Sequence, residues 1–361
     1  MNAWVRSVPF LPEESFYSWL VRAALAQGCD PLAMAGSIWP RWRVWTLDVD
    51  RGVEADKLRS LTQASGIVSA TFETRFLRGD AEKISGHALS DMGTWPWILA
   101  LGSRNRKRLA GMQYCPLCFA TGEPYLKRPW RFTWHTVCAD HGVILVDRCW
   151  SCDALVSPHR LVAQSTDLAE CFSCRADLRL AIPLQGNILA YDFQCRSDAV
   201  LVSSQGTFNE QVWSVHHWFD LARFFAGLTR YALRNEKCGA FVALRELGLL
   251  ATPDRMPVYG VPLELMSPIQ RVSLFEQVSL LMSFGLVDLL RAFKSADMSA
   301  NSLYAISAEL PRAFQAVINE LPRRDHQPHR KGVMLMKPRS KRTVNIMWAR
   351  LLRKMGMRPD E

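Results

Sequence analysis

The spacing of apolar residues predicts that the first hundred residues are helical. After Pro9-Phe-Leu-Pro-Glu-Glu-Ser15, apolar side chains return at the interval expected of a helix with one buried face: Phe16, Trp19, Leu20, Ala23, Ala24 and Ala26. Glu13 and Glu14 would favour the positive N-terminal end of this helix, and Gly28 would end it.

Two shorter helices are predicted around a glycine turn. The first runs from Ala55 to Ala64 and breaks at Ser65-Gly66, and the second runs from Ser69 to Leu77. Two short helices joined by a tight turn have the layout of a helix-turn-helix. The second would offer Arg75 and Arg78 to a DNA groove, although Glu73 would oppose phosphate, so packing or a partner contact remains the alternative.

The pattern changes in the middle of the chain and changes back after it. Residues 110–182 lack helix signals and contain strand formers, at 130–134 and 143–146. From about residue 208 the chain is again helical. One long amphipathic segment begins at Trp213, and two more run from Leu274 to Phe293 and from Leu303 to Leu321. A length of 361 residues fits two or three domains. We therefore predict a mainly α protein with an N-terminal helical domain (1–109), a small β region (110–182) and a C-terminal helical domain (183–361).

The β region carries four closely spaced pairs of metal-ligand residues. Each pair has two residues between its members, which lets one tight turn present both side chains to one ion: Cys115 and Cys118, Cys138 and His141, Cys149 and Cys152, and Cys171 and Cys174. Two such pairs close a tetrahedral Zn²⁺ shell with no position for water, as in structural zinc sites. The sequence predicts two zinc ions per chain, held in tandem zinc ribbons.

Several alternatives to this ligand assignment stay open. Disulfides would need an oxidising compartment, and the N-terminus does not have the pattern of a signal peptide. The first two pairs would bind one ion and the last two pairs the other, but an interleaved arrangement is also compatible with the spacing. His135 could replace His141 as the fourth ligand of the first site. We interpret Cys29, Cys195 and Cys238 as ordinary buried thiols.

Positive charge is concentrated at two places. The formal net charge is +10, and residues 321–361 contain twelve Lys and Arg against three Asp and Glu. Such clusters favour phosphate, so we predict nucleic-acid contacts by two groups of residues: Arg104, Arg106, Lys107 and Arg108, and Lys337, Arg339, Lys341 and Arg342. The plainer interpretation is a solvated tail.

The overall composition is that of a soluble globular protein. Hydrophobic residues make up 49% and charged residues 22% of the chain. The longest uncharged runs, near 92–103 and 277–287, are too short to span a bilayer and fit buried helices better. We expect a cytoplasmic protein.

An ordered set of motifs over roughly residues 5–175 resembles the TniQ family, which includes the TnsD-type target selectors of transposons. Any one motif is ordinary, and the order of the set carries the resemblance: Pro9-Phe-Leu-Pro-Glu-Glu-Ser-Phe-Tyr-Ser-Trp-Leu20, Tyr114-Cys-Pro-Leu-Cys118, Glu123-Pro124-Tyr125, Trp130-Arg131, Cys138-Ala-Asp-His141-Gly142, Leu145 and Asp147-Arg148-Cys149. The helical second half has no motif that could be matched.

This resemblance implies a non-catalytic adaptor in transposition. Family members combine a helix-turn-helix, tandem zinc ribbons and a helical C-terminal region. They link a target signal, either a DNA site or an RNA-guided CRISPR effector complex, to an AAA+ regulator of the TnsC or TniB type that recruits the transposase. The resemblance also implies a homodimer, and the modest length favours types linked to CRISPR or to resolution sites.

Two other functions compete with the adaptor. Asp140-His141 between cysteine pairs also resembles HNH nucleases, in which a free histidine activates water beside a divalent metal. Here His141 completes a zinc pair, and the only candidate for the further ligand is His159, which follows a proline. The stronger alternative is a DNA-binding transcription regulator with a zinc ribbon and a helix-turn-helix.

Overall fold

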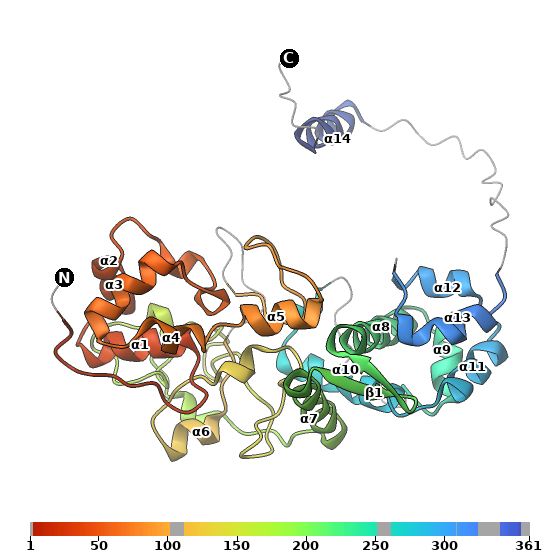
Figure 1. Cartoon of the computed structure of the whole chain (residues 1–361), viewed down its shortest axis with the longest axis horizontal. Helices are drawn as coiled ribbons and strands as arrows, with labels where there is room; N and C mark the ends of the chain where they lie inside the picture. Colours follow the sequence, from red (N-terminus) through yellow and green to blue (C-terminus); the bar gives the residue numbers. More distant parts are fainter. Residues whose placement is uncertain (1–2, 102–111, 251–260, 308, 324–339, 355–361) are drawn as a thin grey trace. The chain divides into compact units, whose positions relative to one another are not determined.

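The computed structural model describes residues 3–101, 112–250, 261–307, 309–323 and 340–354 (Figure 1). The chain divides into two compact units, Met1–Pro322 and Arg323–Glu361. The described part of the second unit is essentially one helix, α14 (Lys341–Lys354). All other elements belong to the first unit.

The fold is mainly helical, which confirms the predicted fold class. The first unit contains these α-helices in chain order: α1 (Phe16–Ala26), α2 (Pro31–Ile38), α3 (Ala55–Ser65), α4 (Ser69–Glu73), α5 (Arg78–Ser85), α6 (Pro116–Thr121), α7 (Ile188–Ser203), α8 (Val215–Arg234), α9 (Gly239–Glu246), α10 (Pro268–Leu281), α11 (Leu286–Ser295), α12 (Ala300–Tyr304) and α13 (Gln315–Glu320). Short 3₁₀ turns connect them, including η2 (Val49–Arg51), η3 (Arg128–Arg131), η5 (Leu178–Leu180) and η7 (Arg312–Phe314).

Helix α1 lies at the centre of the N-terminal half. The Ser15 hydroxyl caps it by accepting a hydrogen bond from the Ser18 N–H at 3.0 Å. Glu14 is fully buried just before the helix and pairs with Arg22 at 2.7 Å. Gln27 caps the C-terminal end, and Gly28 follows it with a φ of +71°. The predicted start and end of this helix are therefore correct.

The predicted helix pair is present as α3 and α4, although α4 is shorter than expected. Gly66 ends α3 in the left-handed conformation, with a φ of +74°. Helix α4 ends at Glu73, and Arg128 donates to the carbonyls of Arg75 and Phe76 just beyond it. These contacts hold the chain out of the helix, so that α5 begins separately at Arg78.

The N-terminal helices and the cysteine-rich segment share one hydrophobic core, which we call the N-terminal core. It includes buried side chains from Val8 to Ala181, among them Trp19 of α1, Leu61 of α3 and Cys138. A fully buried ion pair fastens the two parts together, because Arg131 reaches both Asp48 and Asp50. The Asp50 carboxylate also accepts the Tyr17 N–H of α1 at 2.7 Å.

A second cluster, the C-terminal core, is built mainly by α7, α8, α10 and α11. It also takes in Trp97, Phe132 and Trp134 from the preceding segments. Two of the long helices predicted here are broken: Gly285 separates α10 from α11, and residues 303–321 contain the end of α12, then η7 and α13. Residues 92–101 form no helix, contrary to expectation, because Pro96 interrupts the run and Ile98 bridges to Phe132.

Buried Arg271 of α10 links the two halves. Its guanidinium donates to Gln113 Oε1 at 2.6 Å and to the carbonyls of Met266 and Thr133. Burial lowers its pKa to about 10. The side chain therefore depends on these fixed acceptors, and they hold α10 against the cysteine-rich segment.

The β structure differs from the prediction. The one sheet in the described residues is a hairpin of β1 (Gln205–Phe208) and β2 (Gln211–Ser214), outside the cysteine-rich segment. Within that segment only isolated bridges form, such as Tyr114 with Val146 and Val137 with Ile144. Residues 130–134 begin in η3 after Pro129 rather than in a strand.

Among the described helices, none is both long and apolar enough to cross a membrane by itself. Helices α10 and α11 reach that length and composition only as a pair bent by 105°.

Candidate metal centres

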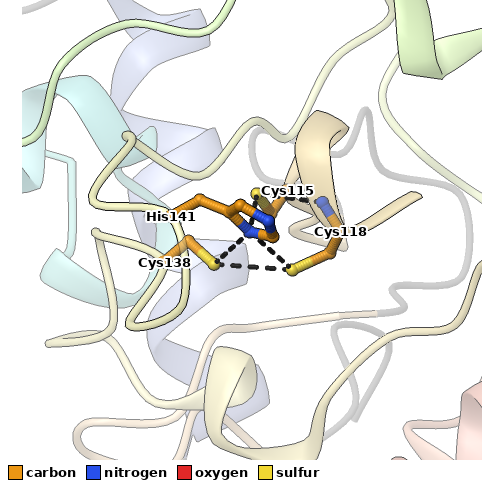
Figure 2. Close-up of side chains that lie close together, drawn as sticks. All are labelled: Cys115, Cys118, Cys138 and His141. Carbon is orange, nitrogen blue, oxygen red and sulfur yellow. Dashed lines mark hydrogen bonds between the residues drawn. The ribbon is translucent and has the colours of Figure 1, made fainter. Parts of the chain in front are cut away.

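The first candidate centre brings together Cys115, Cys118, Cys138 and His141 (Figure 2). His141 Nδ1 lies 3.3 Å from the Cys118 sulfur, 3.6 Å from that of Cys138 and 3.7 Å from that of Cys115. The sulfurs of Cys118 and Cys138 are 3.5 Å apart. Tetrahedral Zn²⁺ with bonds of about 2.3 Å to sulfur and about 2.1 Å to nitrogen requires ligand separations of about 3.6–3.8 Å. The four side chains therefore fit one metal ion.

The second candidate centre consists of Cys149, Cys152, Cys171 and Cys174. The sulfurs of Cys149 and Cys174 are 3.7 Å apart, and those of Cys152 and Cys171 are 3.8 Å apart. A disulfide would bring two sulfurs to about 2.05 Å. The spacing again fits a tetrahedral ion, and each centre combines consecutive pairs rather than interleaved ones.

Three of the four ligand pairs are presented by the same backbone turn. The residue after the second ligand adopts a positive φ and donates its N–H to the carbonyl of the first ligand: Gly142 to Cys138 at 2.8 Å, Asp153 to Cys149 at 3.0 Å, and Arg175 to Cys171 at 2.9 Å. The first ligand of each pair also donates its own N–H to a backbone carbonyl just beyond the turn, that of residue 143, 154 or 176. These bonds fix both ligands of a pair on one side of the turn.

The remaining pair is held by a helix. Cys115 is the N-cap of α6, Pro116 occupies its first turn, and the Cys115 sulfur accepts the Cys118 N–H at 3.5 Å. Cys149 and Cys171 accept N–H groups in the same way, from Ser151 and Ser173 at 3.4 Å each. Such donors stabilise thiolates, the form in which cysteine binds a metal.

The crowded thiols titrate unevenly, as expected of sites that need a cation. In the first centre, contact with Cys115 and Cys138 raises the pKa of Cys118 far above its usual range, whereas contact with Cys115 and Cys118 lowers the pKa of Cys138. In the second, burial raises the pKa of Cys171 to about 12, and a backbone hydrogen bond from Ala176 lowers the pKa of Cys174 to about 7. In each cluster the pKa of one thiol is therefore lowered and that of a neighbour is raised, and a bound cation would stabilise the thiolates together.

The first centre is joined to its surroundings on two sides. Lys127 Nζ contacts the Asp140 carboxylate at 2.6 Å, between the two ligands of the second pair. On the other side, the Gly142 carbonyl accepts the Gly186 N–H at 2.8 Å, and Gln194 of α7 donates to the Val137 carbonyl at 3.0 Å. A hollow of about 360 Å³ beside the ligands is lined by Leu11, Tyr125 and Trp130, among others.

The second centre is more open. Cys152 and Cys174 are exposed, whereas Cys149 and Cys171 are buried. Its supporting contacts lie close by in the chain: the Trp150 indole donates to the Asp177 carbonyl at 2.8 Å, and the Arg160 guanidinium stacks 4.1 Å from the Phe172 ring centre. Arg179 connects it to the first centre by donating to the Phe119 carbonyl of α6 at 3.1 Å.

The arrangement of α1, the buried Arg131 pair and the first centre falls within a recognised domain. Residues 5–145 match the sequence model of the TniQ family. The chain carries a TniQ domain. The TniQ domain is associated with transposition, and it covers α1–α6 together with all four ligands of the first centre. The second centre lies just beyond it, and a search of curated proteins finds no match to the chain.

The histidines and cysteines considered as alternatives lie outside the two centres. His135 Nε2 lies 2.9 Å from the Asp198 carboxylate, and His159 is buried beside Tyr17, whose hydroxyl is 2.6 Å from its Nδ1. All ten cysteines are free of disulfides. The expectation that the three other thiols are buried is wrong for Cys195, which is exposed on α7, while Cys29 and Cys238 are half-buried.

The structure places four of the predicted nucleic-acid residues. Arg75 is half-buried with its guanidinium 4.9 Å from the Phe10 ring centre, and Arg78 pairs with Glu82 and Asp91. Lys341 is exposed at the start of α14. Arg342 is the next residue of that helix, and the structure describes its backbone only. Outside the described residues altogether lie Arg104, Arg106, Lys107, Arg108, Lys337 and Arg339.

Sequence reasoning missed the buried charges that support the TniQ domain. Arg131 was visible as part of a family motif, but nothing in the pattern pointed to Asp48 and Asp50 as its partners. Arg271 lies in a segment without any motif, and two of its acceptors, Thr133 and Gln113, are more than a hundred positions away. These partners come together only through the tertiary fold.

Proposed function

We propose that this protein is a non-catalytic adaptor in transposition. It would connect a target-recognition complex to the AAA+ regulator that recruits the transposase. The observation that carries the proposal is the TniQ domain over residues 5–145, built around a four-ligand metal centre. The signal on the target side is either an RNA-guided complex or a DNA site, and the adaptor acts as a homodimer.

Two Zn²⁺ ions per chain would have a structural role in this adaptor. Each centre offers four ligands, so a bound ion has no open position at which to activate water. His141 directs Nδ1 at three sulfurs, which supports a ligand role and speaks against its use as the free base of a nuclease. The Asp140 carboxylate pairs with Lys127 at 2.6 Å and lies 3.8 Å from the Cys118 sulfur, beside the four-ligand cluster and not among its members.

The basic residues near the C-terminus would contact nucleic acid in the assembled complex. Between Asp325 and Asp360 the sequence has no acidic residue, while lysines and arginines recur throughout. Replacing Arg339, Lys341 and Arg342 by Ala should reduce the salt dependence of binding, with the slope falling by about 0.7–0.9 for each phosphate that is no longer neutralised. An unchanged slope in a salt titration of the targeting complex would leave these residues as a solvated surface.

A reconstituted reaction tests the adaptor proposal. Purified chain, AAA+ regulator, transposase and donor DNA are combined with a target carrying either a DNA site or a guide complex, and insertions are mapped by sequencing. We expect targeted insertion only when the chain is present, and co-sedimentation of the chain with the AAA+ regulator.

Three outcomes would overturn the proposal. Targeted insertion that persists without the chain would exclude an adaptor role. Magnesium-dependent cutting by the pure chain, lost in a folded His141→Ala variant, would favour a nuclease. Binding restricted to its own promoter, without any effect on insertion, would favour a transcription regulator.

A further inference from the structure

Helix α7 is apolar on two opposite faces. Its inner face packs into the C-terminal core through Phe193, Val200 and other buried residues, beside β1 and α10 (Figure 1). Its other face carries what we call the outer stripe: Ile188, Tyr191, Cys195, Ala199 and Val202. Ile188 is 80% exposed and Val202 is 85% exposed, while Cys195 and Ala199 are also exposed.

The spacing of the outer stripe is that of a helix-pairing seam. The five residues follow at intervals of three, four, four and three positions, so they form one narrow line along the helix. Within the described part of the chain, four of the five remain exposed to solvent. Single exposed apolar residues are normal on protein surfaces, but a continuous line of them along four turns indicates a partner.

We propose that the outer stripe is where two copies of this chain meet, with the two α7 helices antiparallel and Cys195 at the twofold axis. In this arrangement a residue that precedes Cys195 in one copy lies opposite the residue that follows Cys195 by the same number of positions in the other copy. Ile188 then faces Val202 of the second copy, and Tyr191 faces Ala199. The large Tyr191 side chain meets a small one, so the stripe is complementary to itself in size.

Charge also favours this pairing. Asp192 and Arg196 lie on one flank of the stripe and contact each other within the chain at 2.8 Å. A twofold axis across antiparallel helices brings the same flank of both copies together. Asp192 therefore lies beside Arg196 of the second copy, as opposite charges do at the edges of paired helices. This pair occurs twice across the axis, against one contact between the two copies of Arg196.

On the other flank, like charges are kept apart. Asp198 is engaged by His135 at 2.9 Å. It lies three positions beyond Cys195, so the two copies of Asp198 are about 9 Å apart along the helix axis.

This inference specifies the surface of the expected homodimer and does not depend on the transposition partners. Oligomeric state is measured on the pure protein, whereas the adaptor role is measured in the reconstituted reaction. A chain that dimerises but does not direct insertion, or directs insertion as a monomer, would separate the two proposals.

The first test measures mass by light scattering across a concentration series. Val202→Asp should raise the dimer dissociation constant at least about tenfold, because it places a charge in the seam of both copies. Val287→Asp is the matched control, since Val287 is 70% exposed on α11 and lies outside the stripe. A monomeric wild-type chain, or equal effects of the two variants, would overturn the proposal.

The second test uses Cys195 as a probe of the axis. Mild oxidation with diamide should give a covalent dimer in the wild type and in a Cys29→Ser/Cys238→Ser variant, but not in Cys195→Ser. Metal is kept in excess to protect the two cysteine clusters. Crosslinking that is unchanged in Cys195→Ser would place the contact elsewhere.

The third test exchanges the flanking charges. Asp192→Arg and Arg196→Asp should each weaken the dimer by severalfold, and the double variant should restore it, because positions 192 and 196 of opposite copies again carry opposite charges. A merely structural pair within one chain would also be restored in stability. The decisive readout is therefore the dissociation constant, and a double variant as weak as the single ones would contradict the antiparallel arrangement.

Discussion

The two candidate metal centres share the same ligand chemistry but differ in what depends on them. The first takes its pairs from α6 and from a turn that touches α7 and Lys127, inside the TniQ domain. The second lies within residues 149–174, with two exposed cysteines and supporting contacts mostly from its own neighbourhood. Equal affinity for a metal would therefore produce unequal consequences for the fold.

The largest expected effect comes from removing one ligand of each centre in turn. Structural zinc contributes about 10–16 kcal/mol in small peptides, as much as the whole stability of a typical domain. Cys138→Ser should reduce the yield of soluble protein severalfold, because the turn at residues 137–142 contacts both the N-terminal core and α7. Cys174→Ser should leave folded protein with one zinc ion. Soluble yield and elemental analysis measure both, and equal losses would remove the distinction.

Chelation should separate the centres in time. The exposed sulfurs of Cys152 and Cys174 are accessible to a chelator, whereas Cys115 and Cys138 are buried. We expect one zinc equivalent to be released in a fast phase and the second in a slow phase that follows unfolding. A colorimetric zinc indicator and circular dichroism, recorded together, measure the two phases. Release of both ions in one phase would show that the centres open together.

A smaller effect is expected from Gly186, which supports the first centre from behind. A Cβ there would lie 2.6 Å from the Val137 side chain and 2.7 Å from the Gly142 carbonyl. Gly186→Ala should lower the free energy of unfolding by about 1–3 kcal/mol, as overpacking does. Gly122→Ala is the control, because its Cβ would meet nothing within 4 Å. Thermal unfolding compares the two, and a neutral Gly186→Ala would mean that the turn can shift freely.

The smallest effect should come from the surface ion pair at each centre. Lys127 pairs with Asp140 beside the first centre at 2.6 Å, and Arg148 pairs with Asp153 beside the second at 2.9 Å. Both carboxylates are at least half exposed, so Lys127→Ala and Arg148→Ala should each cost less than about 1 kcal/mol. Denaturant titrations at low and high salt measure this. A larger loss for Lys127→Ala would mean that Asp140 also positions His141.

The β1–β2 hairpin was not predicted, although its turn has a signal in the local sequence. The β1–β2 hairpin turns at Asn209 and Glu210, which have φ values of 49° and 63°. Asparagine at the first of two such positions is a known preference of tight hairpin turns, so this hairpin could have been found. The strands expected at 130–134 and 143–146 appear only as bridges, because the metal-binding turns reverse the chain before a ladder can extend.

The sequence by itself determined the local features: α1 with its cap, the glycine that ends α3, and the eight ligands in four pairs. Each depends on residues within one or two turns of chain, so spacing and residue type suffice. Tertiary structure alone decided which ligand pairs share an ion and which carboxylates pair with Arg131. It also decided that Cys195 is exposed. Those outcomes depend on contacts between residues distant in the chain, and residue type does not encode which distant neighbour will be met.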